Sequence, residues 1–325
     1  MKRSMPIFLV ASLVAILVAC NGSTGGLGSV PSAVPTASAD TGGPDLTPAP
    51  SSSTNPSTAP SIEPSDAPGA TATPAGSPAE TMIVRAYFVL GGEPGTVGLV
   101  PVLRVVPKSP AVATAAMNAL LAGPTAKEGG DRTMTSAIPD GTGLLGVTIK
   151  NGVATVDLTT QFDSGGGTAS MQYRLAQVVY TLTQFTTVKS VIFQIEGQTV
   201  TVFGSEGIVL DGPVGRAHYY DQLPAIFVDR PAYGAAIGNP GKITGNANVF
   251  EAQFRMAILD ASGKTLVDEP VMATCGTGCR GTFAVTLSYS VGKAQWGTLH
   301  AYDPSEKDGT PESVRDYPVW LTPAG

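Results

Sequence analysis

The chain has only two histidines, His218 and His300, and this limits the hydrolytic chemistry that the sequence can support. A Ser-His-acid triad needs an imidazole that the fold places between a nucleophile and a carboxylate. His218 lies in an expected interdomain linker, His300 lies in an expected strand, and no G-x-S-x-G pattern occurs. We therefore expect no triad, and we interpret both imidazoles as exposed or half-buried side chains.

Paired carboxylates are a second candidate for catalysis, because glycan cleavage uses two acids roughly 5–10 Å apart. The acids that could meet are Asp157, Asp163 and Glu196. Asp157 alternates with Val156 and Leu158, which is typical of a solvent-facing position in a strand. Sequence spacing alone does not place two acids at the required separation, so a cell-wall hydrolase remains the alternative hypothesis.

An acidic stretch near the C-terminus could in principle hold calcium. It contains Asp303, Ser305, Glu306, Asp308 and Gly309. Calcium loops of the EF-hand type require acids at fixed spacings that this stretch does not match. We favour a solvated turn, and we expect no metal site.

Residues 141–146 match the pattern G-x-G-x-x-G. A dinucleotide site needs that loop between a strand and a helix, so that the helix N-terminus meets the pyrophosphate. Here Pro139 and Asp140 precede the glycines and an expected β-hairpin follows. The pattern therefore predicts a turn, and we expect no cofactor.

The strongest chemical signal is a cysteine at the end of an apolar leader. Residues 7–19 form a 13-residue apolar run, interrupted only by Ser12, behind Lys2 and Arg3. A membrane span needs about 20 apolar residues, so this shorter run with a charged start predicts a secretory signal. The run ends at Cys20.

The cleavage site itself resembles a known lipidation motif. Leu17-Val18-Ala19-Cys20 is similar to the lipobox of bacterial lipoproteins. That resemblance implies cleavage before Cys20, acylation of its thiol with diacylglycerol, and often a further fatty acid such as palmitate on the new amino terminus. It also implies that membrane lipid is a partner through Cys20, on the outer face of the cytoplasmic membrane.

The two remaining cysteines, Cys275 and Cys279, are the candidates for a disulfide. An exported compartment permits oxidation. The glycines between them give the freedom to bring the Cα atoms within the roughly 4.4–6.8 Å that a disulfide needs. Two thiols do not complete a tetrahedral zinc site, and His300 is the only histidine in that part of the chain. We favour a structural disulfide over a free or reactive pair, and over a metal site.

The net charge argues against two kinds of partner. The chain has 19 Lys and Arg against 25 Asp and Glu, and the leader holds two of the basic side chains and no acid. The mature chain therefore carries 17 minus 25, or −8. This argues against nucleic acid, which requires a basic face, and against adhesion to anionic lipid by charge alone.

Residues 20–80 are expected to be a disordered linker behind the lipidated cysteine. Residues 21–80 contain eleven prolines, five acids, no aromatic residue and no Lys or Arg. Such a segment cannot bury enough apolar surface to offset the entropy of ordering. As a coil its ends would lie on the order of 45 Å apart, and in polyproline geometry it would reach roughly 190 Å.

Residues 81–212 are predicted to form an α+β domain, an antiparallel sheet with two helices on one face. The first helix, 111–122, has an expected start at Ser109-Pro110 and ends at Gly123-Pro124. The second, 168–185, carries one apolar stripe at Met171, Leu175, Val178, Leu182 and Phe185. The predicted strands are 82–90, 99–106, 145–149, 153–158, 188–195 and 198–203.

Residues 222–325 are predicted to form an all-β sandwich of immunoglobulin-like shape. No helical stripe occurs there, and about seven short β-like runs follow one another at close spacing. The Cys…Trp…Cys pattern of antibody domains is absent, because Cys275 and Cys279 lie too close together to bridge two sheets. The expected strands are 226–228, 241–248, 251–259, 265–271, 281–288, 295–302 and 314–321.

Several blocks of the first domain are together similar to a known family. They are LVPV at 99–102 with Arg104, LLAGPT at 120–125 with Glu128, SAIPDGT at 136–142, GVATVDL at 152–158 and QVVYTLTQF at 177–185. Over residues 81–204 they resemble the sporulation and spore germination domain called GerMN. That resemblance implies a non-enzymatic domain, similar to the ring-building modules of envelope complexes, with protein contacts and self-assembly.

The second domain has a resemblance of its own. GNANVFEA at 245–252, GTF at 281–283, and Ser305 with Asp308-Gly309 carry it. Over residues 222–322 they resemble the immunoglobulin-like domain of bacterial spore germination, which often follows GerMN. The resemblance does not establish that the organism makes spores, and it identifies no binding residue.

We therefore expect a non-enzymatic lipoprotein of the cell envelope. Residues 1–19 would be its signal peptide, and the two domains would present surfaces that bind an envelope protein or peptidoglycan. The alternatives are the wall hydrolase with paired carboxylates and a lipoprotein that captures a small solute. The second is weaker, because neither domain indicates a hinge-bounded cleft.

Overall fold

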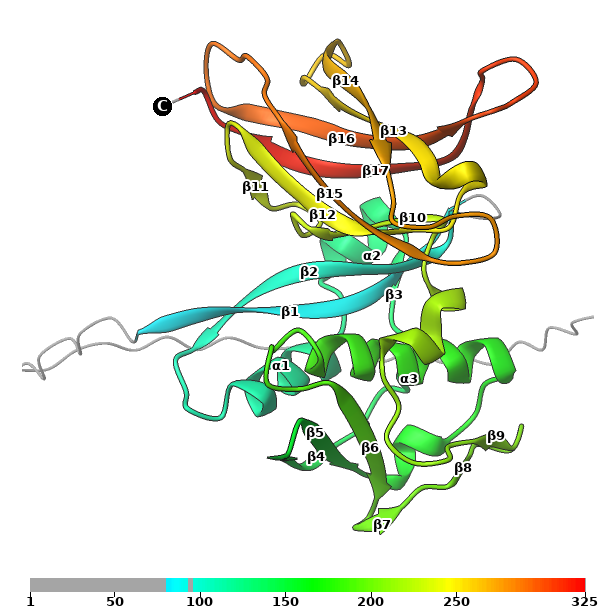
Figure 1. Ribbon diagram of the computed structural model, residues 1–325. Coiled ribbons are helices and arrows are strands. Elements are labelled where there is room, and N and C mark those ends of the chain that lie inside the picture. The colour runs from blue at the N-terminus through cyan, green and yellow to red at the C-terminus, as the bar shows by residue number, and fades with distance from the viewer. Residues whose placement is uncertain (1–79, 93–95, 325) are drawn as a thin grey trace, which may run out of the picture. The chain divides into compact units, whose positions relative to one another are not determined.

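The computed structural model describes residues 80–92 and 96–324 (Figure 1). The predicted signal peptide, Cys20 and all but the last residue of the predicted linker lie outside the described residues. Within the described residues, no helix combines the length and apolar character of a membrane span.

The first domain begins with a long antiparallel hairpin. Strand β1 pairs with β2 along its full length and with the short β3 at its far end, in the order β2-β1-β3. Seven consecutive β1 residues, 84–90, are buried, because helices α1 and α3 pack against the strand and the hairpin also contacts β10. The bounds are β1 Thr81–Leu90, β2 Gly98–Pro107 and β3 Met134–Thr135.

Helix α1 (Val112–Leu121) confirms the first predicted helix, but its start differs from the prediction. Ala111 occupies the N-cap position, and Ser109 contributes by accepting a hydrogen bond from the Ala111 N–H at 3.1 Å. Pro110 therefore precedes the helix and does not open it. At the other end Gly123 adopts φ +74° and donates its N–H to the Leu120 carbonyl, as expected for a glycine that ends a helix.

A second, short helix follows that the sequence pattern did not predict. Helix α2 (Ala126–Arg132) starts with a capping box in which the Thr125 hydroxyl accepts from the Glu128 N–H and the Glu128 carboxylate accepts from the Thr125 N–H. Its seven residues are too few to show an apolar period, so only the cap marks it in the sequence.

The hairpin around Asn151-Gly152 forms as predicted, with φ of +50° and +81° at these two residues. The strand after α3 then pairs in parallel with β5, and β7 extends the sheet in the order β4-β5-β6-β7. This differs from the single antiparallel sheet that we expected. The bounds are β4 Leu144–Lys150, β5 Val153–Leu158, α3 Thr168–Leu182, β6 Ser190–Ile195 and β7 Gln198–Thr199.

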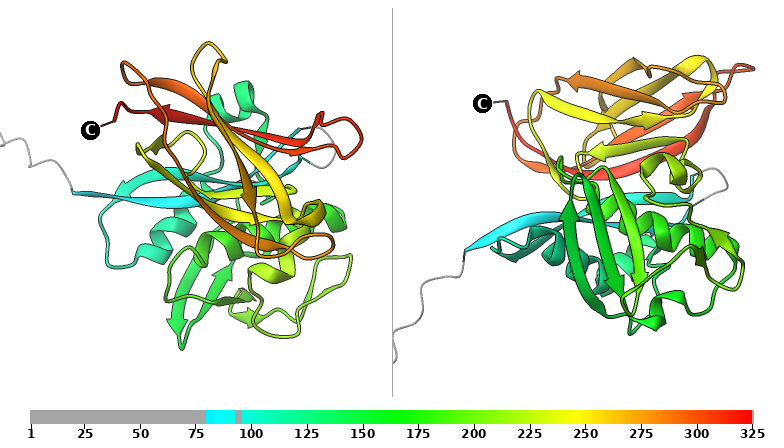
Figure 2. Two further views of the ribbon diagram at one scale, coloured as in Figure 1. Left: turned by 45° about the horizontal axis from the view of Figure 1, so that its top comes forward. Right: turned by 60° about the horizontal axis from the view of Figure 1, so that its bottom comes forward.

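The two sheets of this domain lie on opposite sides of the helices. Helix α1 packs against β1 and β4, and α3 packs against β1 and β6, so the helices form a middle layer (Figures 1 and 2). The α+β class is therefore confirmed, although the helices do not lie over one face of one sheet. The remaining elements are the 3₁₀ turn Thr160–Asp163, the small hairpin β8 (Val202–Phe203) with β9 (Ile208–Val209), and the 3₁₀ segment η2 (Arg216–Gln222).

The second domain is the predicted β-sandwich. One sheet has the order β10-β12-β15 and the other the order β11-β17-β16-β13-β14. Between them Phe254 and Phe283 pack edge to face with ring centroids 4.9 Å apart. The bounds are β10 Ile226–Arg230, β11 Ala236–Ile237, β12 Gly241–Ala247, β13 Gln253–Leu259, β14 Thr265–Met272, β15 Gly281–Leu287, β16 Gln295–Pro304 and β17 Pro311–Leu321.

Candidate functional site

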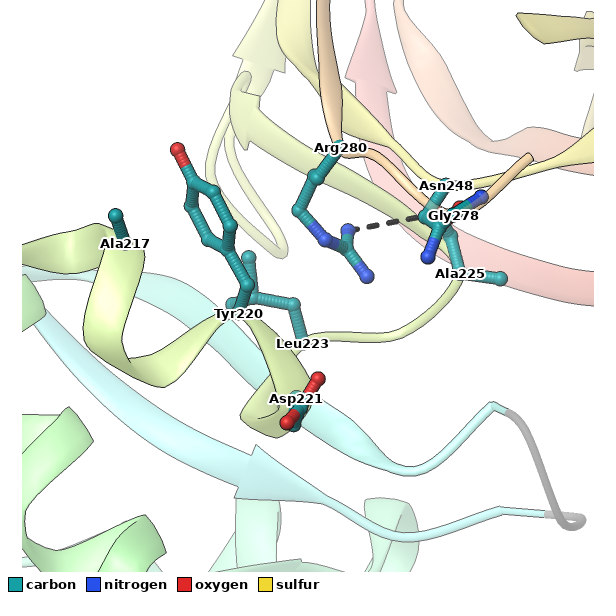
Figure 3. A pocket seen from close by; sticks show the side chains of 8 residues that line it. All are labelled: Ala217, Tyr220, Asp221, Leu223, Ala225, Asn248, Gly278 and Arg280. Atoms are coloured by element: carbon teal, nitrogen blue, oxygen red, sulfur yellow. Dashed lines mark hydrogen bonds between the residues drawn. The ribbon is translucent and has the colours of Figure 1, made fainter. Parts of the chain in front are cut away.

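A polar pocket of about 500 Å³ lies where the connecting segment η2 meets the second domain (Figure 3). One wall comes from η2 and the chain just after it, and the other from the ends of β12 and β15. The volume falls in the range of small-ligand sites. Its lining residues are Ala217, Tyr220, Asp221, Leu223, Ala225, Asn248, Gly278 and Arg280.

Arg216 fixes the first wall of the pocket. Its guanidinium lies over the ring of Tyr180 at 4.6 Å and over that of Tyr87 at 5.5 Å. It donates to the Thr183 hydroxyl at 2.9 Å and the Tyr87 hydroxyl at 3.1 Å, and lies 3.5 Å from an Asp229 carboxylate oxygen. These contacts join η2 to α3, β1 and β10, so they set where the pocket residues of η2 lie.

The charges of this cluster stabilise one another. The Tyr87 hydroxyl donates to Asp229 at 2.6 Å. Burial and, after it, the nearby Asp229 carboxylate raise the pKa of Tyr87, which therefore stays protonated. Burial opposes the charge of Arg216, but Tyr87, Asp229 and Tyr180 offset it, and the pKa of the guanidinium is raised. Arg216 therefore stays charged, and its positive charge is balanced by the groups around it.

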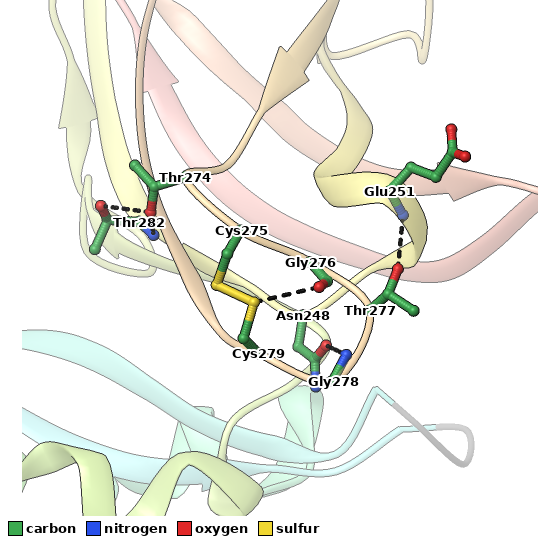
Figure 4. The surroundings of a disulfide bond; sticks show 9 residues. All are labelled: Asn248, Glu251, Thr274, Cys275, Gly276, Thr277, Gly278, Cys279 and Thr282. Atoms are coloured by element: carbon green, nitrogen blue, oxygen red, sulfur yellow. Dashed lines mark hydrogen bonds between the residues drawn. A yellow bond between two sulfur atoms is a disulfide. The ribbon is translucent and has the colours of Figure 1, made fainter.

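A disulfide loop forms the second wall (Figure 4). The structure joins Cys275 and Cys279, with Cα atoms 6.0 Å apart. Inside the loop, Gly278 donates its N–H to Asn248 Oδ1 at 3.2 Å, and Thr277 Oγ1 accepts from the Glu251 N–H at 3.0 Å. The loop is therefore held against the end of β12, and it carries Gly278 to the edge of the pocket.

Arg280 follows this loop and presents a guanidinium to the pocket (Figure 3). Its Nη1 donates to the Pro224 carbonyl at 3.0 Å, to the Asn246 side-chain oxygen at 3.0 Å and more weakly to the Ala225 carbonyl at 3.5 Å. The guanidinium lies 5.9 Å from the Tyr220 ring centroid. All its hydrogen-bond partners among the described residues are neutral oxygens.

The acids considered for glycan cleavage are all engaged with turns. Asp157 accepts from the Gly197 N–H at 2.9 Å, Asp163 from the Gly204 N–H at 2.7 Å, and Glu196 from the Thr160 N–H at 3.2 Å. Each carboxylate thereby fixes a backbone segment at one end of the first domain. None of the three lines the pocket described above.

The two histidines lie in different domains. His218 belongs to η2, where its Nδ1 lies 3.1 Å from the Gly215 nitrogen and completes a local cap. His300 lies on β16 with its Nδ1 2.7 Å from an Asp316 carboxylate oxygen. Among the described residues, no serine hydroxyl forms a hydrogen bond with His300 or Asp316.

The other two sequence candidates are turns. The first three residues of the 141–146 pattern form a turn in which Gly141 has φ +80°, and the last three already belong to strand β4, so the pattern does not lead into a helix. In the acidic stretch, Asp308 accepts from the Thr310 hydroxyl and N–H, and these bonds lower the pKa of Asp308. Burial raises the pKa of Asp303, with Glu312 and Glu306 adding to it. Among the described residues no cluster of three His, Cys, Asp or Glu is placed to hold a metal.

Sequence reasoning missed Arg216 and Arg280, the two arginines that organise the pocket. Neither lies in a motif, and each meets its partners only after distant segments have folded together. One local signal was available for Arg280: it directly follows Cys279, so a constrained loop in the sequence pointed to that position.

Comparisons with known proteins assign both domains to families. Residues 85–201 match the family model described as "Sporulation and spore germination", and residues 225–310 match the "Immunoglobulin-like domain of bacterial spore germination". No curated protein matches the chain.

Three solved structures illustrate the likeness. The first GerMN domain of the sporulation protein GerM from Bacillus subtilis is 22% identical, with 42% of this chain and 98% of that chain covered and a TM-score of 0.36. The tandem GerMN domains of the same protein are 16% identical, with coverage of 76% and 62% and a TM-score of 0.38. A putative lipoprotein from Clostridium perfringens is 18% identical, with coverage of 44% and 93% and a TM-score of 0.31. This chain therefore spans less than two thirds of the tandem structure.

Proposed function

Because this chain carries a sporulation and spore germination domain followed by the immunoglobulin-like domain of bacterial spore germination, we propose that it is a lipid-anchored envelope protein that binds a wall or protein partner without catalysing a reaction. The single observation that supports this most is the order of parts. An apolar leader that ends at Cys20 and a Pro-rich linker precede the two domains. Acyl chains on Cys20 would hold the protein at the membrane, and the linker would set its reach.

The first domain offers an exposed strand edge for such contacts. Strand β4 lies at the edge of its sheet, and Leu145 and Ile149 are 51% and 44% exposed. Unpaired backbone groups on an edge strand can pair with a strand from another chain, and apolar side chains beside them add contact area. This edge supports a role in partner binding or self-assembly.

The anchor is tested by replacing Cys20 with serine in the full-length chain. We expect the wild-type protein in the membrane fraction and the Cys20→Ser variant in the medium or uncleaved. As a matched control, Ser12→Cys leaves Cys20 in place and should leave fractionation unchanged. Membrane retention and normal processing of Cys20→Ser would contradict lipid anchoring.

Binding is distinguished from hydrolysis by incubating the purified full-length protein with peptidoglycan. Retention of the protein on sedimented wall, with no soluble fragments released, supports the binding role. Release of muropeptides that is lost in Asp157→Asn or Glu196→Gln would support the hydrolase instead.

We also propose that the Cys275–Cys279 disulfide is structural. Closing a five-residue loop is worth about 2 kcal/mol in the chain-entropy account. The Cys279→Ser variant should therefore unfold at lower urea concentration. Intact-mass measurement after alkylation, with and without reduction, tests the bond directly, and alkylation of both thiols without reductant would contradict it.

A further inference from the structure

Arg280 is the basic side chain among the residues that line the pocket. Among the described residues no carboxylate lies within ion-pair distance of its guanidinium. By contrast, Arg216 in the same region has Asp229 beside it. An unpaired guanidinium that lines a pocket is a natural receptor for an anionic group of a ligand.

The hydrogen bonds of Arg280 leave the Nε and Nη2 edge of its guanidinium available to a ligand. The three acceptors from the protein, two carbonyls and an amide oxygen, all contact Nη1. Nε and Nη2 have no hydrogen-bond partner among the described residues, and both keep some surface accessible to solvent. These two nitrogens carry parallel N–H groups, which match the two oxygens of a carboxylate. The bonds to Nη1 hold the side chain in place at the pocket wall, and they leave the Nε and Nη2 edge without a described protein acceptor.

The surroundings strengthen this edge as an anion receptor. The Tyr220 ring and the bonds to Nη1 fix the guanidinium plane, so little rotational freedom is lost when a ligand binds. Partial burial lowers the pKa of Arg280, yet an arginine stays charged at neutral pH. Asn248 uses its Oδ1 for Gly278, and its amide Nδ2 remains as a second donor at the pocket wall.

Asp221 is the one acid among the residues that line the pocket, and it opposes the binding of an anion. Its charge acts on Arg280 from beyond ion-pair distance. Neutralising Asp221 should therefore strengthen the binding of an anion, and the direction of this change in affinity can be tested.

We propose that this pocket binds the free carboxylate of a short peptide, held by the Nε and Nη2 edge of Arg280 and the amide of Asn248. The identity of the peptide as a wall stem peptide rests on the proposed function, which places the domains beside peptidoglycan. The carboxylate site itself rests on the geometry of the pocket. The two can therefore fail separately.

Isothermal titration calorimetry with the purified full-length protein in detergent tests the site. The probes are N-acetyl-D-alanyl-D-alanine and its C-terminal amide, which differ in the charge of one group. We expect measurable binding of the acid and at least tenfold weaker binding of the amide. Equal binding of both, or of neither, would overturn the proposal.

Variants locate the binding in the pocket. Arg280→Gln should weaken binding of the acid at least tenfold, and Arg280→Lys should weaken it less, since a charge remains but the paired donors are lost. Arg230→Gln, at an exposed arginine outside the pocket, should leave affinity unchanged. Equal affinity of Arg280→Gln and wild type would overturn the assignment.

Two isosteric changes guard against variants that fail to fold. Asn248→Asp keeps the oxygen that accepts from Gly278 but adds a negative charge, so affinity for the acid should fall several-fold. Asp221→Asn should raise it several-fold. If neither affinity moves while circular dichroism shows folded protein, the carboxylate does not bind here. Membrane fractionation is unaffected by this outcome, so the proposed anchoring is judged independently.

Discussion

Arg216 illustrates how one side chain can position a site that it does not line. It contacts α3 through Thr183 and Tyr180, β1 through Tyr87, and β10 through Asp229. Removing it would leave the Asp229 carboxylate without its counter-charge and would free η2. The same loss should disturb the pocket, because η2 forms one of its walls.

The Arg216→Ala variant should therefore lose about 2–4 kcal/mol of unfolding free energy, since a half-buried charge network is broken from one side. Urea unfolding followed by circular dichroism measures the change. Arg230→Ala, at an exposed arginine, should change stability by less than about 0.5 kcal/mol. Similar small changes in both variants would show that the cluster contributes little.

Glu128 links two of the sequence blocks that carry the family resemblance. Arg104 donates to its carboxylate at 2.7 and 3.0 Å, and the guanidinium also lies over the Phe88 ring. Burial alone would raise the pKa of Glu128, but the hydrogen bonds from Arg104 and Thr125 overcome it and the pKa is lowered. In this chain, the two residues therefore form an ion pair between β2 and the capping box of α2.

This lowered pKa predicts a pH dependence of stability. The contribution is fully present above the unfolded pKa of about 4.3 and is lost as the pH falls through the lower folded pKa. Glu128→Gln should thus be less stable than wild type at pH 6, by about 1–2 kcal/mol, and nearly equal to it at pH 2.5. Urea unfolding at the two pH values measures this, with Glu269→Gln as control. A difference that persists at low pH would contradict the assignment.

At the scale of elements, helix α3 was predicted from its apolar stripe, but the burial of its polar side chains was not. The predicted stripe is buried from Met171 to Leu182, and so are Arg174, Gln177 and Thr181, which lie between its members. Gln177 donates to the Tyr87 carbonyl and accepts from the Ala137 N–H. Arg174 donates to three backbone carbonyls. The helix lies between two sheets, so its polar face is buried as well. Hydrogen bonds satisfy the polar groups on that face.

Leu175→Ala should cost about 2–5 kcal/mol, because the side chain is fully buried and its removal leaves a cavity. Thermal denaturation of the full-length chain measures this. Gln172→Ala, on the half-exposed part of the same helix, should cost less than about 1 kcal/mol. An unchanged melting temperature for Leu175→Ala would contradict the core position of α3.

At the scale of the whole described unit, the two domains share contacts that neither makes alone. Apolar residues of both domains belong to one continuous core. Arg315 on β17 is 4% exposed and donates to the carbonyls of Leu90, Thr96 and Gly98, around the β1–β2 turn. These bonds from a buried guanidinium to backbone carbonyls tie the sandwich to the first domain.

This sharing predicts cooperative unfolding of the two domains. Scanning calorimetry of the full-length chain should show one main transition, since separating the domains would expose core residues and the Arg315 contacts. Arg315→Met keeps an apolar stem but removes the donors, and should cost about 1–3 kcal/mol. Two well-separated transitions in the wild type would contradict a shared core.

The amino-acid sequence alone determined many of the local features of this protein. Local patterns were sufficient for the Asn151-Gly152 hairpin, for the extents of α1 and α3 to within a few residues, and for every strand of the sandwich except the two-residue β11, because turn residues and apolar periods act over short distances. They also indicated both families, which the comparisons assign to the same segments. The short α2 and the parallel pairing of β5 with β6 were missed, since a seven-residue helix has little period and strand direction depends on the path of the connection.

The tertiary structure decided the site. The pocket joins residues 217–225 to residues 248–280, and the partners of Arg216 come from segments more than 100 positions apart. No pattern in one segment reports which oxygens a distant arginine will meet. Whether a side chain such as Arg280 ends with an ionic partner or without one depends on how whole elements pack. Charge pairing in the interior is therefore a property of the fold, whereas leader, linker and strand periodicity are properties of the sequence.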